Sequence, residues 1–324
     1  MTIIVTGAAG FIGFHVATRL LDRGDRVVGV DNLNDYYDVR LKEARLARLR
    51  GRNGFGFQRM DVADWQAIQT LAGGDVTGII HLAAQAGVRH SLKDPFVYGQ
   101  ANVMGQITMS ELAKRCPNLR SFVYASSSSV YGGNTKLPFA VTDPVEHPVS
   151  LYAATKRSCE LIAESYAHLF RLPSVGLRFF TVYGPWGRPD MAAYIFTDAM
   201  FQGRPITLFN NGDLKRDFTY VDDIVSGTVA SLDRPPADDG KAAPHRVYNL
   251  GNHRSEPLRR FVALLEQATG RTAKVELAPM QAGDVYETYA DIEASRADLG
   301  FEPTTSIDVG LPRFVDWYRA YNKV

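Results

Sequence analysis

A short β-rich run, Ile3-Ile4-Val5, stands near the start of the chain. Two residues on it leads into Gly7-Ala8-Ala9-Gly10-Phe11-Ile12-Gly13, which contains three glycines. Ile12, Val16 and Leu20 then recur at every fourth position, which predicts an amphipathic helix. Glycines between a strand and a helix let the backbone approach a pyrophosphate, and the helix N-terminus supplies N–H groups and positive potential. The stretch therefore predicts a dinucleotide site made by Gly7, Gly10, Phe11, Ile12 and Gly13.

Short β-rich runs alternate with amphipathic stretches through the first half of the chain. Further strands are expected at residues 26–30, 55–60, 78–82, 121–125 and 175–179. This alternation predicts an α/β fold with a Rossmann-type, doubly wound parallel sheet whose strands are buried on both faces. Beyond residue 180, glycine and proline cluster in an expected loop at 183–189 and the elements become shorter, with strands at 205–209 and 246–250 and helices at 221–232 and 258–269. We predict a dinucleotide-binding domain over 1–180 and, over 181–324, a smaller, mainly substrate-binding domain interleaved with returning Rossmann elements.

Composition restricts the partners and the compartment. The 324 residues are 45% hydrophobic, and 36 basic and 35 acidic residues leave a net charge of +1, which favours neither nucleic acid nor a membrane surface as partner. The two cysteines are expected to be reduced thiols rather than a disulfide. Without a signal-peptide pattern, a long apolar run or metal-ligand spacing, we expect a cytoplasmic protein with no bound metal.

The expected strand ends indicate which dinucleotide is bound. Asp31 ends the second strand, where a carboxylate accepts hydrogen bonds from the adenosine ribose and repels a 2′-phosphate, so NAD is favoured over NADP. The alternative is a solvated loop aspartate. Residues after the second, third and fourth strands are expected to contact the adenine or flank the cofactor, namely Asn32, Asp61, Val62, Leu82, Ala83, Ala84 and Gln85.

Tyr152 and Lys156 lie four residues apart, on one face of an expected helix. A free phenol has a pKa near 10, and a lysine one turn away stabilises its phenolate form. Alone, the pair is equally well read as a surface contact. The serine-rich stretch 125–132 follows an expected strand and offers a hydroxyl that can hydrogen-bond the reacting oxygen. With the dinucleotide site, the set predicts hydride transfer at a carbinol carbon.

The glycine spacing, Asp31, the serine-rich strand end, Tyr152 and Lys156 resemble the extended short-chain dehydrogenase/reductase family. That family includes nucleotide-sugar epimerases, dehydratases and decarboxylases. The resemblance implies that Ser127 is the catalytic hydroxyl and that Asn102 is a helix amide near the cofactor. It also implies that Arg216 binds the nucleotide diphosphate. It also implies a homodimer.

Two stretches, 31–38 and 178–191, are similar to those of UDP-glucuronate 4-epimerases within the family. Dehydratases and decarboxylases carry an acid just after the catalytic hydroxyl, where this chain has Ser128 and Ser129. Thr181 stands where galactose-type epimerases have asparagine, and its smaller hydroxyl suits a carboxylate. Gln281 stands near the place of a family arginine, ahead of Gly283 and Asp284.

Further substrate contacts are expected from arginines and an aromatic ring. Arg89 and Arg188 can make charge-assisted contacts with a carboxylate or phosphate. Phe209 is expected to stack on the uracil; the alternative is that it is a buried strand aromatic. For the arginines, the alternative is a loop position without a ligand.

The resemblance implies NAD-dependent C4 epimerisation of UDP-glucuronate to UDP-galacturonate through a 4-keto intermediate, with Tyr152 as the base. Three other functions remain open at this point. They are a 4-epimerase of neutral UDP-sugars such as UDP-glucose or N-acetyl forms, a UDP-glucuronate decarboxylase, and a non-catalytic NAD-binding regulator.

Overall fold

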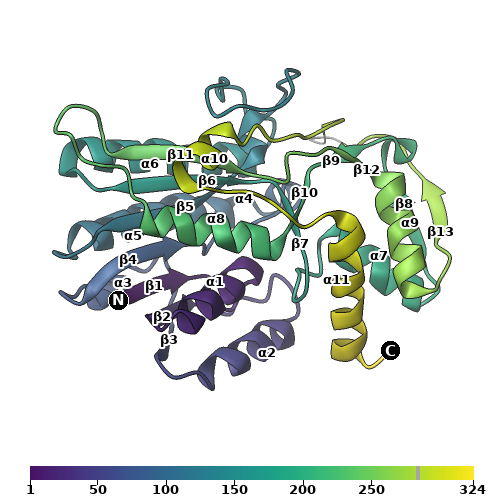
Figure 1. Cartoon of the computed structure of the whole chain (residues 1–324), viewed down its shortest axis with the longest axis horizontal. Coiled ribbons are helices and arrows are strands. Elements are labelled where there is room, and N and C mark those ends of the chain that lie inside the picture. Colours follow the sequence, from purple (N-terminus) through teal and green to yellow (C-terminus); the bar gives the residue numbers. More distant parts are fainter. Residues whose placement is uncertain (282–284) are drawn as a thin grey trace.

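The computed structural model describes residues 1–281 and 285–324, and its centre is a seven-stranded sheet (Figure 1). Every neighbouring pair of strands in this sheet is parallel. The strands are β1 (Thr2–Thr6), β2 (Arg26–Asp31), β3 (Phe55–Arg59), β4 (Val76–His81), β5 (Ser121–Ser127), β6 (Ser174–Phe179) and β11 (His245–Leu250).

The strand order is β11-β6-β5-β4-β1-β2-β3, so the direction of winding reverses between β1 and β4. Thr6 at the end of β1 is in register with Val30 of β2 on one side and His81 of β4 on the other. Ligands of open α/β sheets bind outside the carboxyl ends of the strands at such a reversal. The predicted Rossmann-type, doubly wound parallel sheet is confirmed.

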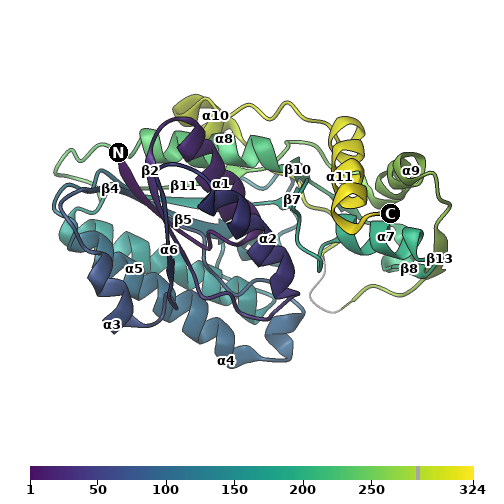
Figure 2. The same cartoon turned by 90° about the horizontal axis from the view of Figure 1, so that it is seen from below.

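Helices cover both faces of the sheet, as Figure 2 shows. One face carries α1 (Phe11–Asp22), α2 (Val39–Arg50), α8 (Val221–Asp233) and α10 (Glu293–Leu299). The other face carries α3 (Trp65–Ile68), α4 (Pro95–Tyr98), α5 (Gly105–Lys114) and α6 (Leu151–Phe170), with a π-helical turn at Gly99–Met104 between α4 and α5. Among the described residues, no helix has the length and apolar character needed to cross a membrane.

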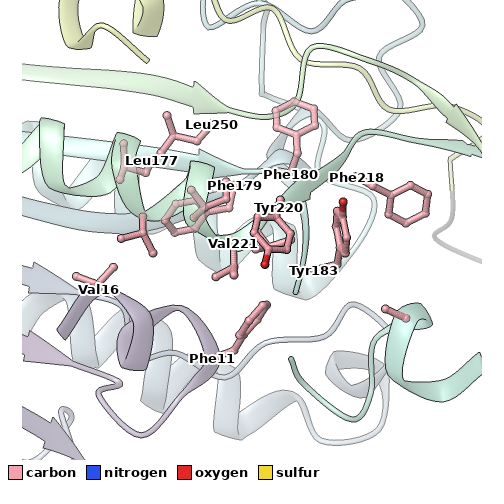
Figure 3. Close-up of a cluster of buried hydrophobic side chains, with 14 of the residues drawn as sticks. Phe11, Val16, Leu177, Phe179, Phe180, Tyr183, Phe218, Tyr220, Val221 and Leu250 are labelled. Atoms are coloured by element: carbon pink, nitrogen blue, oxygen red, sulfur yellow. The ribbon is translucent and has the colours of Figure 1, made fainter. Parts of the chain in front are cut away.

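One cluster of buried side chains lies between the sheet and the helices α1 and α8 and continues toward the elements after β6 (Figure 3), and another packs against α5 and α6. Val16 of α1, Leu177 of β6 and Leu250 of β11 are fully buried. Each such side chain contributes about 1.5–3 kcal/mol by leaving water. The expectation that all strands are buried on both faces is wrong for β3, because this strand forms an edge of the sheet and three of its five residues are exposed.

A smaller lobe stands beside the carboxyl ends of the strands (Figure 1). Its main elements are α7 (Ala192–Phe201), β8 (Pro205–Leu208), α9 (Leu258–Thr269), β13 (Lys274–Leu277) and α11 (Ile307–Asn322), with β8 and β13 paired in parallel. Two short pairs join it to the sheet: β7 (Thr181–Tyr183) with β10 (Phe218–Tyr220), and β9 (Lys215–Arg216) with β12 (Glu256–Pro257). The division into domains at residue 180 stays a prediction.

Two local differences from the predicted elements concern the region of the site. The strand predicted at 121–125 continues to Ser127, so two serines are held in β5 rather than in a loop. The expected loop at 183–189 is preceded by β7, whose last residue is Tyr183. Both extensions depend on pairing with strands distant in sequence, β6 and β10, which short-range patterns do not contain.

Candidate active site

A cavity of about 980 Å³ opens at the carboxyl ends of the strands, with walls from both the sheet and the smaller lobe. The predicted site residues that line it are Gly7, Gly10, Phe11, Ile12, Gly13, Asp31, Asn32, Asp61, Val62, Leu82, Ala83, Ala84, Gln85, Arg89, Ser127, Ser128, Ser129, Tyr152, Lys156, Thr181, Arg188, Phe209 and Arg216. Residues spread over more than 200 positions of the chain therefore share one cavity.

The glycine-rich turn is packed too tightly for side chains. A Cβ atom on Gly13 would lie 2.0 Å from the carbonyl oxygen of Gly7, and one on Gly7 would lie 2.9 Å from the backbone nitrogen of Ala83. Gly7 also has a φ of +70°, which side chains disfavour. Gly10 precedes α1 and carries no side chain to cap it, so backbone N–H groups of the first turn remain for an anionic ligand.

Carboxylates organise the end of the cavity beside β2 and β3. Asp31 accepts hydrogen bonds from the backbone N–H groups of Ala9 (3.1 Å) and Leu33 (2.9 Å), so the carboxylate joins the glycine turn to the next loop. Asn32 donates to Asp61 at 3.0 Å. These polar groups have the position and the acceptor atoms that a ribose and an adenine require.

Asn102 does not line the cavity. It is buried behind the wall in the π-helical turn, where its Oδ1 accepts the N–H of Gln85 at 2.8 Å and its Nδ2 donates to the carbonyl of Gln85 at 3.0 Å. The same Nδ2 donates to Oγ1 of Thr155 at 3.0 Å. Asn102 therefore holds the loop after β4 against helix α6 from behind.

Helix α6 carries Tyr152 and Lys156 into the cavity. It begins after Ser150, whose hydroxyl caps it by accepting the N–H of Ala153 at 3.1 Å. The Lys156 ammonium donates to the carbonyl of Ala125 at 2.8 Å, which fixes it at the end of β5. The ring of Tyr152 is packed edge-to-face against Tyr98, with 6.1 Å between ring centroids. The charge and the phenol are thus presented from one rigid helix.

Ser127 is the last residue of β5 and faces the same cavity. Its hydroxyl donates to Oγ of Ser129 at 3.1 Å and accepts the N–H of Ser129 at 3.2 Å. Ser128 begins the short helical turn that follows. Ser127, Ser128 and Ser129 therefore line the cavity next to one another, with the first and third hydrogen-bonded.

A buried ion pair supports this edge from behind, and the sequence alone did not reveal it. Glu160 on α6 accepts Nε and Nη2 of Arg178 at 2.8 and 2.9 Å, and the two residues are 1% and 3% exposed. Glu160 also accepts the hydroxyl of Ser126 at 2.6 Å. Burial by itself raises the pKa of Glu160, but hydrogen bonds and charge from Arg178 hold it below its usual value.

Arg188 lies in the opposite wall, within Coulombic range of Tyr152. Its Nε and Nη2 donate to Asp190 at 3.0 and 2.5 Å, and Tyr36 donates to the same carboxylate at 3.1 Å. Burial and the Asp190 charge raise the pKa of Tyr36 to about 12, so its hydroxyl stays protonated as a donor.

Contacts within the protein fix the side chains at the end of the cavity beside β8. The Arg89 guanidinium lies over the ring of Phe209, 5.0 Å from its centroid. Arg216 donates from Nη1 to the carbonyls of Lys215 (2.8 Å) and Tyr286 (3.0 Å) while lining the cavity. Gln281 is half-buried and is absent from the residues that line the cavity, and Gly283 and Asp284 fall outside the described residues.

Several polar wall residues were not assigned from the sequence, among them Asn34, Tyr36, Lys42, His90, Asp190 and Arg204. Asn34, Tyr36 and Asp190 belong to the two stretches, 31–38 and 178–191, that carry the resemblance to the epimerases. That resemblance was a usable signal for these three residues. The contact between Tyr36 and Asp190 joins positions 154 apart, which the sequence does not specify.

The residues present fit a dinucleotide. The glycine turn leaves space that a Cβ would fill, the first turn of α1 offers N–H groups, and Asp31 offers a carboxylate beyond them. The same cavity is lined by Ala83, Ala84 and Gln85 after β4 and also by Tyr152. The cavity can therefore hold an extended cofactor whose far end meets the phenol and the lysine.

Comparisons with known proteins agree with this geometry. Residues 3–251 match the NAD dependent epimerase/dehydratase family. The chain is 47% identical to a probable UDP-glucuronate 4-epimerase of Rhizobium meliloti (strain 1021), over 98% of this chain and 97% of the relative. It is 46% identical to UDP-glucuronate 4-epimerase 4 of Arabidopsis thaliana, over 99% of this chain and 76% of the relative.

Solved structures show the same architecture. A UDP-glucuronic acid 4-epimerase from Bacillus cereus, in complex with UDP-glucuronic acid and NAD, superposes with a TM-score of 0.89 at 34% identity, covering 99% of this chain and all of that one. The family match spans most of the chain and includes the glycine turn, Tyr152 and Lys156. The chain therefore belongs to the NAD dependent epimerase/dehydratase family.

Proposed function

We propose that the protein is an NAD-dependent isomerase that interconverts UDP-glucuronate and UDP-galacturonate at C4 through a 4-keto intermediate. One observation carries the proposal. The cavity that contains Tyr152 and Lys156 also brings together three serine hydroxyls, Thr181 and Arg188, a set of donors suited to a carboxylate. Similarity to UDP-glucuronate 4-epimerases along almost the whole chain supports the same substrate.

Tyr152 is the proposed base that removes the proton of the C4 hydroxyl, and later returns it. Lys156, fixed by the carbonyl of Ala125, stabilises the phenolate by its charge. Ser127 hydrogen-bonds the reacting oxygen and shares the proton movement. Bound NAD would supply the acceptor and then the donor for the C4 hydride, so that no net oxidation results once the sugar has turned over.

The carboxylate needs control because a 4-keto hexuronate is a β-keto acid and can lose CO2. That loss is easiest when the bond to the carboxylate lies perpendicular to the carbonyl plane. Ser128, Ser129 and Thr181 are proposed to hold the carboxylate away from that geometry, with Arg188 supplying charge. This chain has serine at the positions after Ser127, where decarboxylases carry an acid.

The nucleotide is proposed to occupy the end of the cavity beside β8. Arg216, anchored to two backbone carbonyls, would contact the diphosphate, and Phe209 would stack on the uracil. Since the Arg89 guanidinium already lies over Phe209, we assign Arg89 to the nucleotide and its phosphates rather than to the sugar carboxylate.

The direct test is NMR of the purified protein with UDP-glucuronate and no added NAD. UDP-galacturonate that accumulates to equilibrium would support both the reaction and a retained cofactor. If nothing forms, the assay is repeated with NAD and then with UDP-glucose. Turnover of UDP-glucose alone would replace the uronate by a neutral sugar, and a UDP-pentose product would mean a decarboxylase.

We propose in addition that the protein is a homodimer. Leu161 and Leu169 lie eight residues apart on α6, therefore on one face of the helix, and are 55% and 67% exposed. Phe96 on the neighbouring α4 is 86% exposed. Exposed apolar side chains on these two helices favour a protein partner. Light scattering at micromolar concentration would give a mass of one chain if the proposal is wrong.

We also propose a cytoplasmic location. The two cysteines are buried and free, as is usual where thiols are kept reduced. Cell fractionation with an antibody would test the location, and recovery in an extracytoplasmic fraction would contradict it.

A further inference from the structure

Arg188 meets the cavity as one half of an ion pair and not as an isolated cation. Asp190 engages Nε and Nη2 side-on, at 3.0 and 2.5 Å, and Tyr36 donates a third hydrogen bond to the carboxylate. A guanidinium has five N–H donors in a planar fork, so it can hold Asp190 on one edge and a second carboxylate on another. Asp190 itself lines the cavity beside Arg188.

The charge of this pair matters because the proposed reaction moves the carboxylate of the substrate. Hydride leaves one face of C4 and returns to the other, so the 4-keto sugar must turn over and its carboxylate must change partners. A cation that bound the carboxylate strongly would favour the starting arrangement and slow the turn. Such ground-state binding lowers KM without raising kcat.

We infer that Asp190 is a specificity-determining residue that weakens the binding of the substrate carboxylate by Arg188. It thereby lowers the affinity for UDP-glucuronate and raises kcat. The inference rests on the proposed function and extends it to a residue that does not itself bind the sugar. Two carboxylates that share one guanidinium repel each other across it. At an effective dielectric constant of about 20 and roughly 7 Å, that repulsion is equivalent to a factor of ten or more in binding.

Asp190 is held in the cavity wall and stays charged there. Tyr36 comes from the loop after β2 and Asp190 from the loop after β7, so their hydrogen bond joins two segments that line the cavity. The charge of Arg188 holds the pKa of Asp190 below its usual value in spite of burial, so the carboxylate remains ionised at neutral pH.

The test is Asp190→Asn, with calorimetric binding of UDP-glucuronate and UDP-glucose to the NAD-bound enzyme. We expect the Kd of UDP-glucuronate to fall about tenfold, the Kd of UDP-glucose to change less than twofold, and kcat with UDP-glucuronate to fall. Asp238→Asn is the matched control, because Asp238 also pairs side-on with an arginine, Arg171, but does not line the cavity.

A rise in the Kd of UDP-glucuronate would overturn the inference and make Asp190 an orienting residue for Arg188. Equal changes for both sugars, or an unchanged Kd, would overturn it as well. The binding ratio between the two sugars needs no turnover. An enzyme inactive on UDP-glucuronate would therefore refute the proposed reaction and leave the effect of Asp190 on carboxylate binding separately measurable.

Discussion

Glu160→Gln should separate the stability of the fold from the organisation of the active site. The substitution keeps the size of the side chain but removes the charge that Arg178 pairs with inside the protein. It also weakens the acceptor of the Ser126 hydroxyl, which lies next to Ser127 at the end of β5.

The expected loss of stability follows from the burial of the pair. Removing one partner of a buried ion pair leaves an uncompensated charge and costs about 3–5 kcal/mol. Arg157 also contacts Glu160 at 2.8 Å, so a second guanidinium loses its partner at the same time. With roughly 2 °C per kcal/mol for a chain of this size, the melting temperature should fall by about 6–10 °C.

The pH dependence has a defined direction. Because Arg178 lowers the pKa of Glu160 in the folded protein, the pair stabilises the fold fully above the unfolded pKa of about 4.3. This contribution is lost as the pH falls through the folded pKa. The difference between the wild type and Glu160→Gln should therefore be constant near neutral pH and shrink below about pH 4.

Thermal unfolding of the NAD-bound protein at several pH values, combined with kcat, is the assay. Glu111→Gln serves as the control, because Glu111 pairs with Lys114 at the surface, where such a pair is worth about 0–1 kcal/mol. The double variant Glu160→Leu/Arg178→Met should lose less stability than Glu160→Gln, since the buried guanidinium of Arg178 is removed together with its partner and that of Arg157 is 31% exposed to water. A fall in melting temperature of less than about 2 °C for Glu160→Gln would refute the reasoning, as would a double variant less stable than Glu160→Gln.

Three further predictions concern the reaction and the cofactor. Tyr152→Phe should lower kcat by about 10²–10⁴ with UDP-glucuronate binding retained in calorimetry, and near-normal turnover would exclude Tyr152 as the base. Thr181→Ala should increase UDP-pentose and CO2 formation in the NMR assay; an unchanged ratio of pentose to epimer would rule out its control of the carboxylate. Gly13→Ala places a Cβ 2.0 Å from the Gly7 carbonyl oxygen and should reduce NAD in the purified protein, whereas Gly56→Ala, with open space around it, should not; full NAD occupancy of Gly13→Ala would contradict the packing argument.

The fold and the cofactor end of the cavity were predictable because their signals are local. A glycine turn, the strand before it and the helix after it lie within about twenty residues, and the steric limit on Gly13 is set inside that segment, whereas the limit on Gly7 comes from Ala83 after β4. Tyr152 and Lys156 are one helical turn apart, so any helix there presents them together.

The other functional contacts were less predictable. Asn102 was expected near the cofactor; it holds Gln85 from behind the cavity wall, and its part in cofactor binding stays a prediction. Arg89 and Phe209 were assigned separately, and packing of the smaller lobe against the sheet stacks one on the other. The strand end at Ser127 depended on pairing between β5 and β6, a contact between segments about fifty residues apart.

The sequence by itself determined the chemistry that each local segment offers: a pyrophosphate turn, an acceptor for a ribose, and a phenol beside a lysine. Only the tertiary structure decided the charges around the sugar. Arg188 carries a formal charge of +1 in the sequence, but in the folded chain Asp190, two residues on, pairs with it, and Tyr36 donates to the same carboxylate. Electrostatic interactions depend on distance and burial, and only the folding together of segments distant in sequence brings Tyr36 and Tyr152 to this ion pair.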